Sequence, residues 1–369
     1  MNYKYFTSES VCAGHPDKIC DQVSDACLDA AYKDDRFSRV AVECLATKNF
    51  FCMAGEVTSK AKMNFEKIGR RVIKRLGYTI PELNFHYRTT PIMVKIHKQS
   101  SDISKGVNRG GAGDQGMMFG YACKETKQLM PAPIIIAHRL AQKLDKIRQK
   151  KIIPYLRPDG KSEVKVRYEK GKPIAVEEVV LAAAHQQQIS NEEIKKDLYQ
   201  KVVIPVLEKF KFKINERNFI VNGAGRWEIG GPASDTGETG RKIIVDTYGG
   251  MGRHGGGCFS GKDLTKVDRS GAYACRFLAK NIVAAGLADR VEVKTSYVIG
   301  RTRPLDRGIE TFGTEKKPRK QIEEFAWKLL DLSVPQILET LDLRRPIYEK
   351  TAAYGHFGRS GFPWEKIVV

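Results

Sequence analysis

Between Asp246 and Asp268 the chain gathers residue types that bind anions. Seven glycines there alternate with four basic side chains, those of Arg253, His254, Lys262 and Lys266. Because glycine lets backbone N–H groups come close to a ligand and cations balance negative charge, this composition indicates a cradle for a polyphosphate. A flexible surface loop is the alternative that the glycines alone would favour, and the spaced cations argue against it.

The same stretch comes close to a P-loop. Gly256–Lys262 reads G-x-x-x-x-G-K, but Asp263 stands where that motif requires the Ser or Thr that binds magnesium. A P-loop phosphotransferase is therefore an alternative function for this chain. That alternative requires a strand of a parallel sheet before the loop and a helix after it. The mismatch favours a nucleotide site of another kind.

A second candidate group opens a helix near the N-terminus. Pro16 suits the first turn, and an apolar stripe follows at helical spacing, through Ile19, Val23, Cys27 and Ala30. Asp17 lies in that turn beside His15, where a carboxylate would face an incoming magnesium-nucleotide. Aspartate recurs at every fourth position, and for Asp25 and Asp29 a solvated helix side is the expected role.

The elements downstream follow an order of helix, hairpin, helix and strand that occurs three times. We expect helices over 61–76, 132–149, from Ser190 to about Phe210 with a kink at Pro205, from a cap at Asp268 to Ala285, and from Pro318 to Leu330. Hairpins are expected around Lys48-Asn49 and Gly171, and strands at 92–97, 218–221 and 290–300. The pattern predicts an α+β fold of three similar subdomains, each a β-sheet with helices on one face.

Two acids interrupt the first hairpin. Glu43 and Glu56 lie in otherwise apolar strands. Burial of a carboxylate is costly unless it is paired, so each acid indicates a bound cation or a ligand ammonium, with an internal salt bridge as the alternative. The polar stretch 99–116 is rich in Ser, Gly, Asp and Asn, and we expect it to act as a lid.

Composition limits the class of protein. A chain of 369 residues is long enough for two or three domains, and no apolar run approaches the ~20 residues of a membrane span. We therefore expect a cytoplasmic enzyme without a membrane partner. Eight cysteines without a C-x-x-C pair favour small core residues over a zinc site or disulfides.

The net charge of +20 raises nucleic-acid binding as an alternative function. The cations are spread along the chain, often beside acids, and no basic tail or aromatic-interleaved basic stretch occurs. That distribution favours a solvated basic surface, and we expect no nucleic-acid partner.

Several long motifs occur in a fixed order along the chain. They are GHPDK at 14–18, GAGDQG at 111–116, GGP…D…TGRK from 230 to 242, DTYGG…RHGGG…FSGKD…KVDRS across 246–270, and the closing TAAYGHFGR and FPWEK. Together they closely resemble the S-adenosylmethionine synthetase, or methionine adenosyltransferase, family over nearly the whole chain. The resemblance implies three similar subdomains about a pseudo-threefold axis, with domains at 1–101, 110–229 and 230–369 whose structural subdomains interleave along the chain.

The resemblance implies a reaction between ATP and L-methionine. In that family the methionine sulfur attacks C5′ of ATP and expels intact triphosphate, which is then hydrolysed to pyrophosphate and phosphate. A neutral thioether needs no general base, so the catalytic work is expected to be alignment and stabilisation of charge on the leaving triphosphate. Two Mg²⁺ ions per site, K⁺, and a homodimer or homotetramer with active sites between subunits are also implied.

The resemblance carries roles onto individual residues. The expected catalytic residues are His15, which helps to stabilise the departing oxygen, Lys161, Lys242 and Lys262. ATP contacts are expected from these four and from Asp159, Arg226, Trp227, Asp235, Arg241 and Cys258, with Trp227 able to stack on adenine. Methionine contacts are expected from Glu56, Gln99, Asp114, Asp235 and Lys266. Asp17 and Asp268 are the expected Mg²⁺ ligands, Glu43 the K⁺ ligand, and Gln99, Asp102, Gly106 and Arg109 parts of the lid.

The chain departs from the family pattern near the expected K⁺ site. Cys12-Ala13 replaces Ser-Glu before GHPDK, and Thr236 stands where Cys is common. The lost acid bears on potassium dependence, but no departure removes a principal charged group. A member without activity that serves as a regulatory partner is a further alternative, which the retention of His15, Asp17 and Lys262 disfavours.

Overall fold

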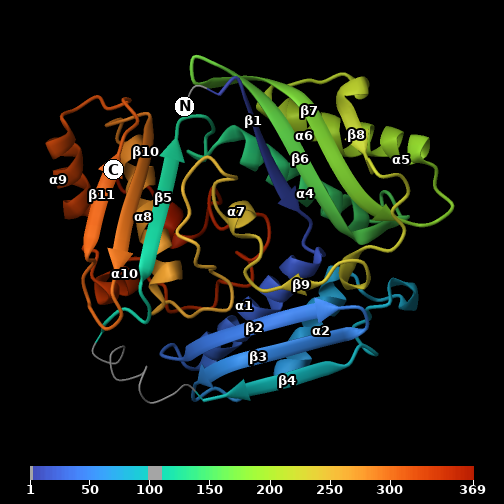
Figure 1. The fold of residues 1–369 in the computed structure, drawn as a ribbon, viewed down its shortest axis with the longest axis horizontal. Helices are drawn as coiled ribbons and strands as arrows, with labels where there is room; N and C mark the ends of the chain where they lie inside the picture. The colour runs from blue at the N-terminus through green and yellow to red at the C-terminus, as the bar shows by residue number, and fades with distance from the viewer. Residues whose placement is uncertain (1–2, 99–109) are drawn as a thin grey trace.

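Three β-sheets surround the centre of the molecule, described here from a computed structural model for residues 3–98 and 110–369 (Figure 1). The first sheet has the order β1-β6-β7-β8, with bounds Tyr5–Val11, Leu156–Glu169, Lys172–His185 and Phe219–Val221. The second is β11-β10-β5, with bounds Asp306–Glu310, Arg290–Tyr297 and Gly116–Cys123. The third is β4-β3-β2-β9, with bounds Ile92–His97, Phe50–Thr58, Arg39–Thr47 and Gly237–Glu238.

A long helix covers one face of each sheet. α1 (Pro16–Asp34) packs on β2, α4 (Ala132–Gln149) on β6 and β1, and α8 (Val267–Ala284) on β5 and β10. Shorter helices complete the layer: α2 (Phe65–Leu76), α5 (Asn191–Leu198), α6 (Ile204–Leu207), α9 (Arg319–Leu329) and α10 (Val334–Thr340). None of the helices in the described part of the chain combines the length and apolarity of a membrane span. The expected α+β fold of three subdomains, with helices on one face of each sheet, is confirmed.

Each sheet contains a strand from a distant part of the chain. β1 pairs with β6, β5 with β10, and β9 with β2. The segments that join these strands therefore cross the middle of the molecule, where the single-turn helix α7 (Ile243–Asp246) lies (Figure 1). Their contacts are close: a Cβ on Gly237 would lie 2.2 Å from the Pro16 carbonyl carbon, and one on Gly240 would lie 2.7 Å from Cys258 Sγ.

Local signals place most elements correctly. β2 and β3 pair from Arg39 opposite Thr58 to Thr47 opposite Phe50, which confirms the hairpin at Lys48-Asn49. α2 ends at Gly77, whose φ of +101° suits glycine, although the helix starts at an Asn64 cap rather than at residue 61. Six of the eight cysteines are buried and all are free, as expected for core residues.

The expected cap of α8 at Asp268 is wrong, whereas the helical segment from Ser190 does reach Phe210 and differs only in where its irregularity begins. α8 has Lys266 at its N-cap, so Asp268 lies inside the first turn, where its carboxylate accepts a hydrogen bond from Lys262 instead of capping the helix. Ser190 caps α5 as expected, but the helix widens into a π-turn over Tyr199–Val203 before Pro205. Proline has no N–H to donate to the carbonyl four residues earlier, so the disruption begins upstream of it.

The expected solvated side of α1 is also wrong, because the helix is buried along most of its length. Asp25 is fully buried and pairs with Arg269 at 2.6 Å. Asp29 accepts hydrogen bonds from the backbone N–H groups of Tyr348 and Glu349, at 2.8 and 2.9 Å. The C-terminal segment around Tyr348 covers the acidic face of α1. The spacing of the aspartates within α1 cannot indicate a contact with so distant a part of the chain.

Gly120 is expected to be a position where a single methyl group destabilises the fold. It lies on β5, and a Cβ there would come 2.0 Å from the Cys275 carbonyl carbon in α8. Since backbone must shift to admit it, Gly120→Ala should lower the free energy of unfolding by about 1–3 kcal/mol or more. Gly308→Ala on β11 is the matched control, because its Cβ would meet only the flexible Lys294 side chain. Equal denaturation midpoints for the two variants would contradict this close packing.

Candidate active site

His15 and Asp17 lie together at the N-terminus of α1. His15 is the N-cap, and its Nδ1 accepts a hydrogen bond from the Asp17 N–H at 3.2 Å. The two residues are 1% and 2% exposed. The Asp17 carboxylate also accepts hydrogen bonds from the Glu238 N–H at 2.9 Å and from Lys242 Nζ. A carboxylate is thus held at a helix N-terminus, where the backbone dipole favours negative charge.

The surroundings fix the charge states of this pair. Burial, assisted by the positive charge of Lys242, lowers the pKa of His15 to about 3, so the ring is neutral at neutral pH. Because Nδ1 is the acceptor, the proton of the neutral ring belongs on Nε2. Nε2 is buried without a partner in the described part of the chain. Burial opposes ionisation of Asp17, but hydrogen bonds from Lys242 and Glu238 outweigh it and lower its pKa.

The segment after β9 brings two cations to Asp17. Lys242 Nζ donates to its carboxylate, and Arg241 Nε lies 3.9 Å from the same side chain. Arg241 is also oriented by a hydrogen bond of 3.2 Å to the Thr236 carbonyl oxygen. With two cations at one carboxylate, this end of the site retains positive charge for an anionic ligand.

β6 adds an acid, and an aromatic ring packs beside it. Asp159 is 3% exposed and accepts a hydrogen bond from the Gly231 N–H at 2.7 Å, and burial raises its pKa to about 7. A Cβ on Gly230 would lie 2.9 Å from Asp159 Cβ and 3.3 Å from the Trp227 ring, so the two side chains are close. We call the whole set the histidine group: His15, Asp17, Asp159, Lys161, Arg226, Trp227, Asp235, Arg241 and Lys242.

Lys161, Arg226 and Asp235 complete the histidine group at the surface. All three are exposed. Lys161 lies on β6 and pairs with Val11 of β1, and Val11 precedes His15 by four residues. The positive charge of Lys161 acts to lower the pKa of both His15 and Asp159. The charge of Asp235 also acts on Asp159. Arg226 is included in the histidine group only because it precedes Trp227 in the chain.

Five further site residues line one small cavity of about 110 Å³. We call them the lysine group: Glu43, Asp114, Lys262, Lys266 and Asp268. Lys262 Nζ donates to the Asp268 carboxylate at 2.6 Å. Burial opposes the charge on Lys262, but Cys258 and Asp268 outweigh that effect and raise its pKa, so the ammonium is charged. Gly257 makes room here, because a Cβ there would lie 2.4 Å from Asp268 Oδ1.

Asp263 is the residue whose role the sequence did not reveal. It is fully buried and accepts hydrogen bonds from the Val40 N–H at 2.9 Å and from Lys266 Nζ at 2.6 Å. It therefore fixes the loop that carries Lys262 and Lys266 to β2. The P-loop alternative fails here, because the short helix α7 rather than a strand precedes the loop and α8 begins only at Val267.

The remaining expected residues lie around the two groups. Glu56 lies on β3, and its carboxylate is 3.3 Å from His97 Nε2. In the sheet Glu56 is opposite Ala41 of β2, which lines the small cavity. Cys258 lies between the groups, beside Gly240 and near Lys262. Gln99, Asp102, Gly106 and Arg109, and so the whole expected lid, lie outside the described residues.

The histidine and lysine groups are separate within one chain. Over residues 3–98 and 110–369, no hydrogen bond or ion pair joins a member of one group to a member of the other. The same residues include no cluster of three or more His, Cys, Asp or Glu side chains that could hold a metal ion. Asp17 and Asp268, both expected to bind Mg²⁺, belong to different groups.

Family models and known proteins match nearly the full length of the chain. Models of the N-terminal, central and C-terminal domains of S-adenosylmethionine synthetase match residues 3–101, 109–227 and 229–366. The S-adenosylmethionine synthase of Treponema denticola is 49% identical over 371 residues, covering 98% of this chain and 95% of that protein. The enzymes of that name from Roseiflexus castenholzii and Desulfosudis oleivorans are 50% and 48% identical, each over 98% of this chain and 94% and 95% of their own lengths.

Proposed function

The chain belongs to the S-adenosylmethionine synthetase family, and from that premise we propose how its own residues carry the reaction. It is a methionine adenosyltransferase that joins ATP and L-methionine to form S-adenosylmethionine, with phosphate and diphosphate as the other products. The observation that carries the proposed mechanism is the neutral His15 ring, whose Nε2 has no partner within the described residues, with the cations Arg241 and Lys242 beside it at Asp17.

The chemistry requires stabilisation of a leaving group. As the methionine sulfur bonds to C5′, the C5′–O5′ bond breaks and negative charge grows on the departing triphosphate. The thioether has no proton to lose, so a base would contribute nothing. Fixed positive charges and N–H donors near that oxygen lower the barrier most, because they need no reorganisation during the step.

We assign His15 to the oxygen that leaves C5′. Its Nε2 carries the proton of the neutral ring and has no protein partner within the described residues. The N-cap position holds the ring rigidly at the start of α1. The His15 N–H therefore donates to the departing oxygen, while Lys161, Lys242 and Arg241 surround the phosphates.

Lys262 and Lys266 are assigned to the far end of the triphosphate and the methionine side. Each is held by a carboxylate, Asp268 at 2.6 Å for Lys262 and Asp263 at 2.6 Å for Lys266. This pairing keeps the ammonium groups in position before substrate enters, which reduces the entropy lost on binding. Glu56 and Asp114 are proposed to receive the methionine ammonium.

The family uses metal ions, and we propose Mg²⁺ at Asp17 and Asp268. The carboxylates fit, since Mg²⁺ prefers oxygen ligands and uses one or two carboxylates together with substrate phosphates. The space that Gly257 leaves beside Asp268 also fits a ligand there. Bound Mg²⁺ would neutralise part of the triphosphate charge. We propose K⁺ at Glu43, which is exposed and borders the small cavity.

We propose that the site is completed by a second copy of the chain, so that the histidine group of one subunit faces the lysine group of its partner. Two observations support this: within residues 3–98 and 110–369 no hydrogen bond or ion pair joins the two groups, and apolar side chains are exposed on and near the sheets. These include Leu45, Met93, Val94, Met117 and Ile220. A partner subunit that covers part of this apolar surface would remove it from water. A dimer or a tetramer would satisfy the arrangement.

We further propose the domain division at 1–101, 110–229 and 230–369, and a cytoplasmic location. The spans of the three family models support the division. The exchange of β1, β5 and β9 between sheets means that these sequence domains are not three independent folding units.

The test of the function is a release assay for phosphate and pyrophosphate. The protein is incubated with ATP and Mg²⁺, with and without methionine, and with and without K⁺. We expect both products, together with S-adenosylmethionine, only when methionine is present. Phosphate release that ignores methionine would contradict the assignment. The K⁺ arms decide whether loss of the acid at Ala13 has removed potassium dependence.

The His15 assignment has its own test in NMR. Because its pKa is lowered to about 3, the free protein should show a neutral Nε2–H tautomer down to about pH 5, where an ordinary histidine is protonated. Ring-labelled histidine, with His15→Asn to assign the signal, reports this directly. A His15 signal that titrates near pH 6.5 would contradict the neutral-donor role.

A further inference from the structure

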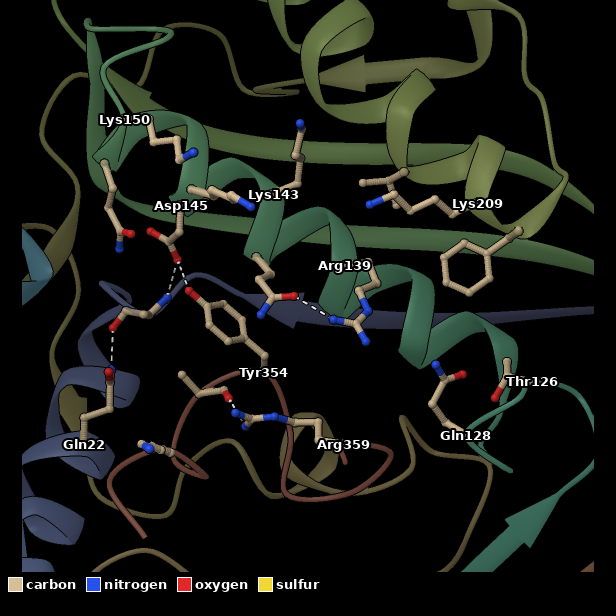
Figure 2. A pocket seen from close by; sticks show the side chains of 18 of the residues that line it. Gln22, Thr126, Gln128, Arg139, Lys143, Asp145, Lys150, Lys209, Tyr354 and Arg359 are labelled. Atoms are coloured by element: carbon tan, nitrogen blue, oxygen red, sulfur yellow. Dashed lines mark hydrogen bonds between the residues drawn. The ribbon is translucent and has the colours of Figure 1, made fainter. Parts of the chain in front are cut away.

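A second cavity has a volume of about 1160 Å³, and Figure 2 shows the side chains that line it. None of the residues that line it belongs to the histidine or the lysine group. Its walls come from the polar face of α4, the turn after β5, the end of the helical segment near residue 209, and the C-terminal segment around Tyr354 and Arg359. Ala13 just before α1, Gln22 on α1 and Arg75 on α2 complete the lining, so six separate parts of the chain build the cavity.

The lining carries a large excess of positive charge. Nine lysines and arginines face three carboxylates. Each carboxylate already has partners in the protein. Glu125 accepts hydrogen bonds from the Ala132 N–H and the Tyr168 hydroxyl. Asp145 accepts them from the Ala13 N–H and the Tyr354 hydroxyl, and Glu349 forms ion pairs with Arg71 and Arg75. Within the described residues, Arg75 is the one cation of the nine with an ion pair. Eight positive charges therefore lack a counter-ion in the part of the chain that the structure describes.

Four of these cations form a stripe along α4 and its C-cap, Lys150. Arg139, Lys143, Lys146 and Lys150 follow at intervals of four, three and four residues, so they lie on one face over about 16 Å of helix. Like charges on successive turns destabilise a helix. The helix dipole compensates for Lys146 and Lys150 near the C-terminal end, but not for Arg139 and Lys143 farther back.

Arg359 faces this stripe from the C-terminal segment (Figure 2). It is fixed by hydrogen bonds to the carbonyl oxygens of Ala353 at 2.9 Å and Gly355 at 3.1 Å, and it stacks over the Phe362 ring at 5.1 Å. Burial and the charge of Arg139 lower the pKa of Arg359. Two guanidinium groups thus repel each other across the cavity, and an anion between them would remove that repulsion.

We propose that this cavity binds a chain of linked phosphates, either free inorganic polyphosphate or the polyphosphate of a nucleotide. An extended stripe of cations with an arginine opposite suits several phosphates in a row better than a single one. Single-stranded nucleic acid fits less well, because such sites add aromatic rings for base stacking. Only Phe210 and Tyr354 are aromatic here, and the Tyr354 hydroxyl is bound to Asp145.

The test measures binding of medium-chain inorganic polyphosphate to the full-length protein by calorimetry. Lys143→Gln with Lys150→Gln should weaken binding by about tenfold or more, since two charge-assisted contacts are lost. The matched control is Lys320→Gln with Lys328→Gln, which removes two exposed charges of α9 that form no ion pair with any described residue. The control should change affinity by less than about twofold. The cavity variant should keep methionine-dependent turnover, which separates this proposal from the proposed function.

Each remaining result decides the assignment. Equal weakening in both double variants would overturn it, because bulk charge would then be the cause. Loss of binding in Lys262→Ala instead of the cavity variant would place polyphosphate in the active site and also overturn it. Tighter binding of an RNA oligomer, lost in the cavity variant, would replace the proposal by a nucleic-acid site. Competition by tripolyphosphate and by a non-hydrolysable ATP analogue then separates free polyphosphate from a nucleotide as the source.

Discussion

Lys262→Ala is expected to lower methionine-dependent turnover by about 10²–10³-fold while the fold stays intact, because Lys262 is proposed to hold the triphosphate on which negative charge grows, and one preorganised donor to such charge contributes ~3 kcal/mol. Lys262 lies in the small cavity of the lysine group, and its ammonium is held by Asp268 at 2.6 Å. It is 21% exposed, so alanine leaves no large hole in the core. Initial rates at saturating ATP and methionine measure the effect.

The control for Lys262 is a lysine with the same kind of partner away from the site. Lys294 donates to Asp306 at 2.7 Å on the exposed side of β10 and β11. Lys294→Ala should leave turnover unchanged, since an exposed ion pair contributes little. Near-normal turnover of Lys262→Ala, with unchanged circular dichroism, would remove Lys262 from the mechanism.

Asp25→Ala is expected to cause the largest loss of stability, about 3–5 kcal/mol of the free energy of unfolding. Both Asp25 and Arg269 are fully buried, and two guanidinium nitrogens donate to the carboxylate at 2.6 and 2.8 Å. The carboxylate also accepts the Gly261 N–H at 2.9 Å, so it ties α1 to the glycine-rich loop. Without it, the Arg269 charge is left buried and uncompensated.

Asp34→Ala provides the comparison on the same helix. Asp34 is the last residue of α1 and is exposed. Its substitution should change stability by less than about 0.5 kcal/mol. Urea denaturation of both variants measures the difference, and similar midpoints would mean that the buried pair contributes no more than a surface charge.

The sequence predicts the local elements because their signals are local. Alternating apolar residues around Lys48-Asn49 specify the first hairpin, and Gly77 ends α2 where its left-handed backbone requires glycine. The α+β class follows from the order of such elements. The family follows from motifs that carry chemistry, such as GHPDK, whose histidine and aspartate meet at one helix N-terminus.

The packing of distant segments is what the sequence does not reveal. Asp25 and Asp29 have the spacing of a solvated face, and only the partners from Arg269 and residues 348–349 make that face buried. In the sequence, Asp263 is only a mismatch to the P-loop motif. In the structure its buried carboxylate accepts a hydrogen bond from Lys266 Nζ and holds that side chain in place. The resemblance implies a site between subunits, but the motifs alone do not show that Asp17 lies with His15 and Lys242 while Asp268 lies with Lys262.

The most direct measurement of the central claim is complementation between two inactive variants. Lys242→Ala disables the histidine group, and Lys262→Ala disables the lysine group. If each site combines the two groups from different subunits, a mixed dimer contains one intact site, and random mixing should restore about one quarter of normal turnover. Co-expression of the two variants, each with its own affinity tag, tests this. Turnover that stays at the sum of the two parents would show that both groups serve a site within one chain, and would contradict the account.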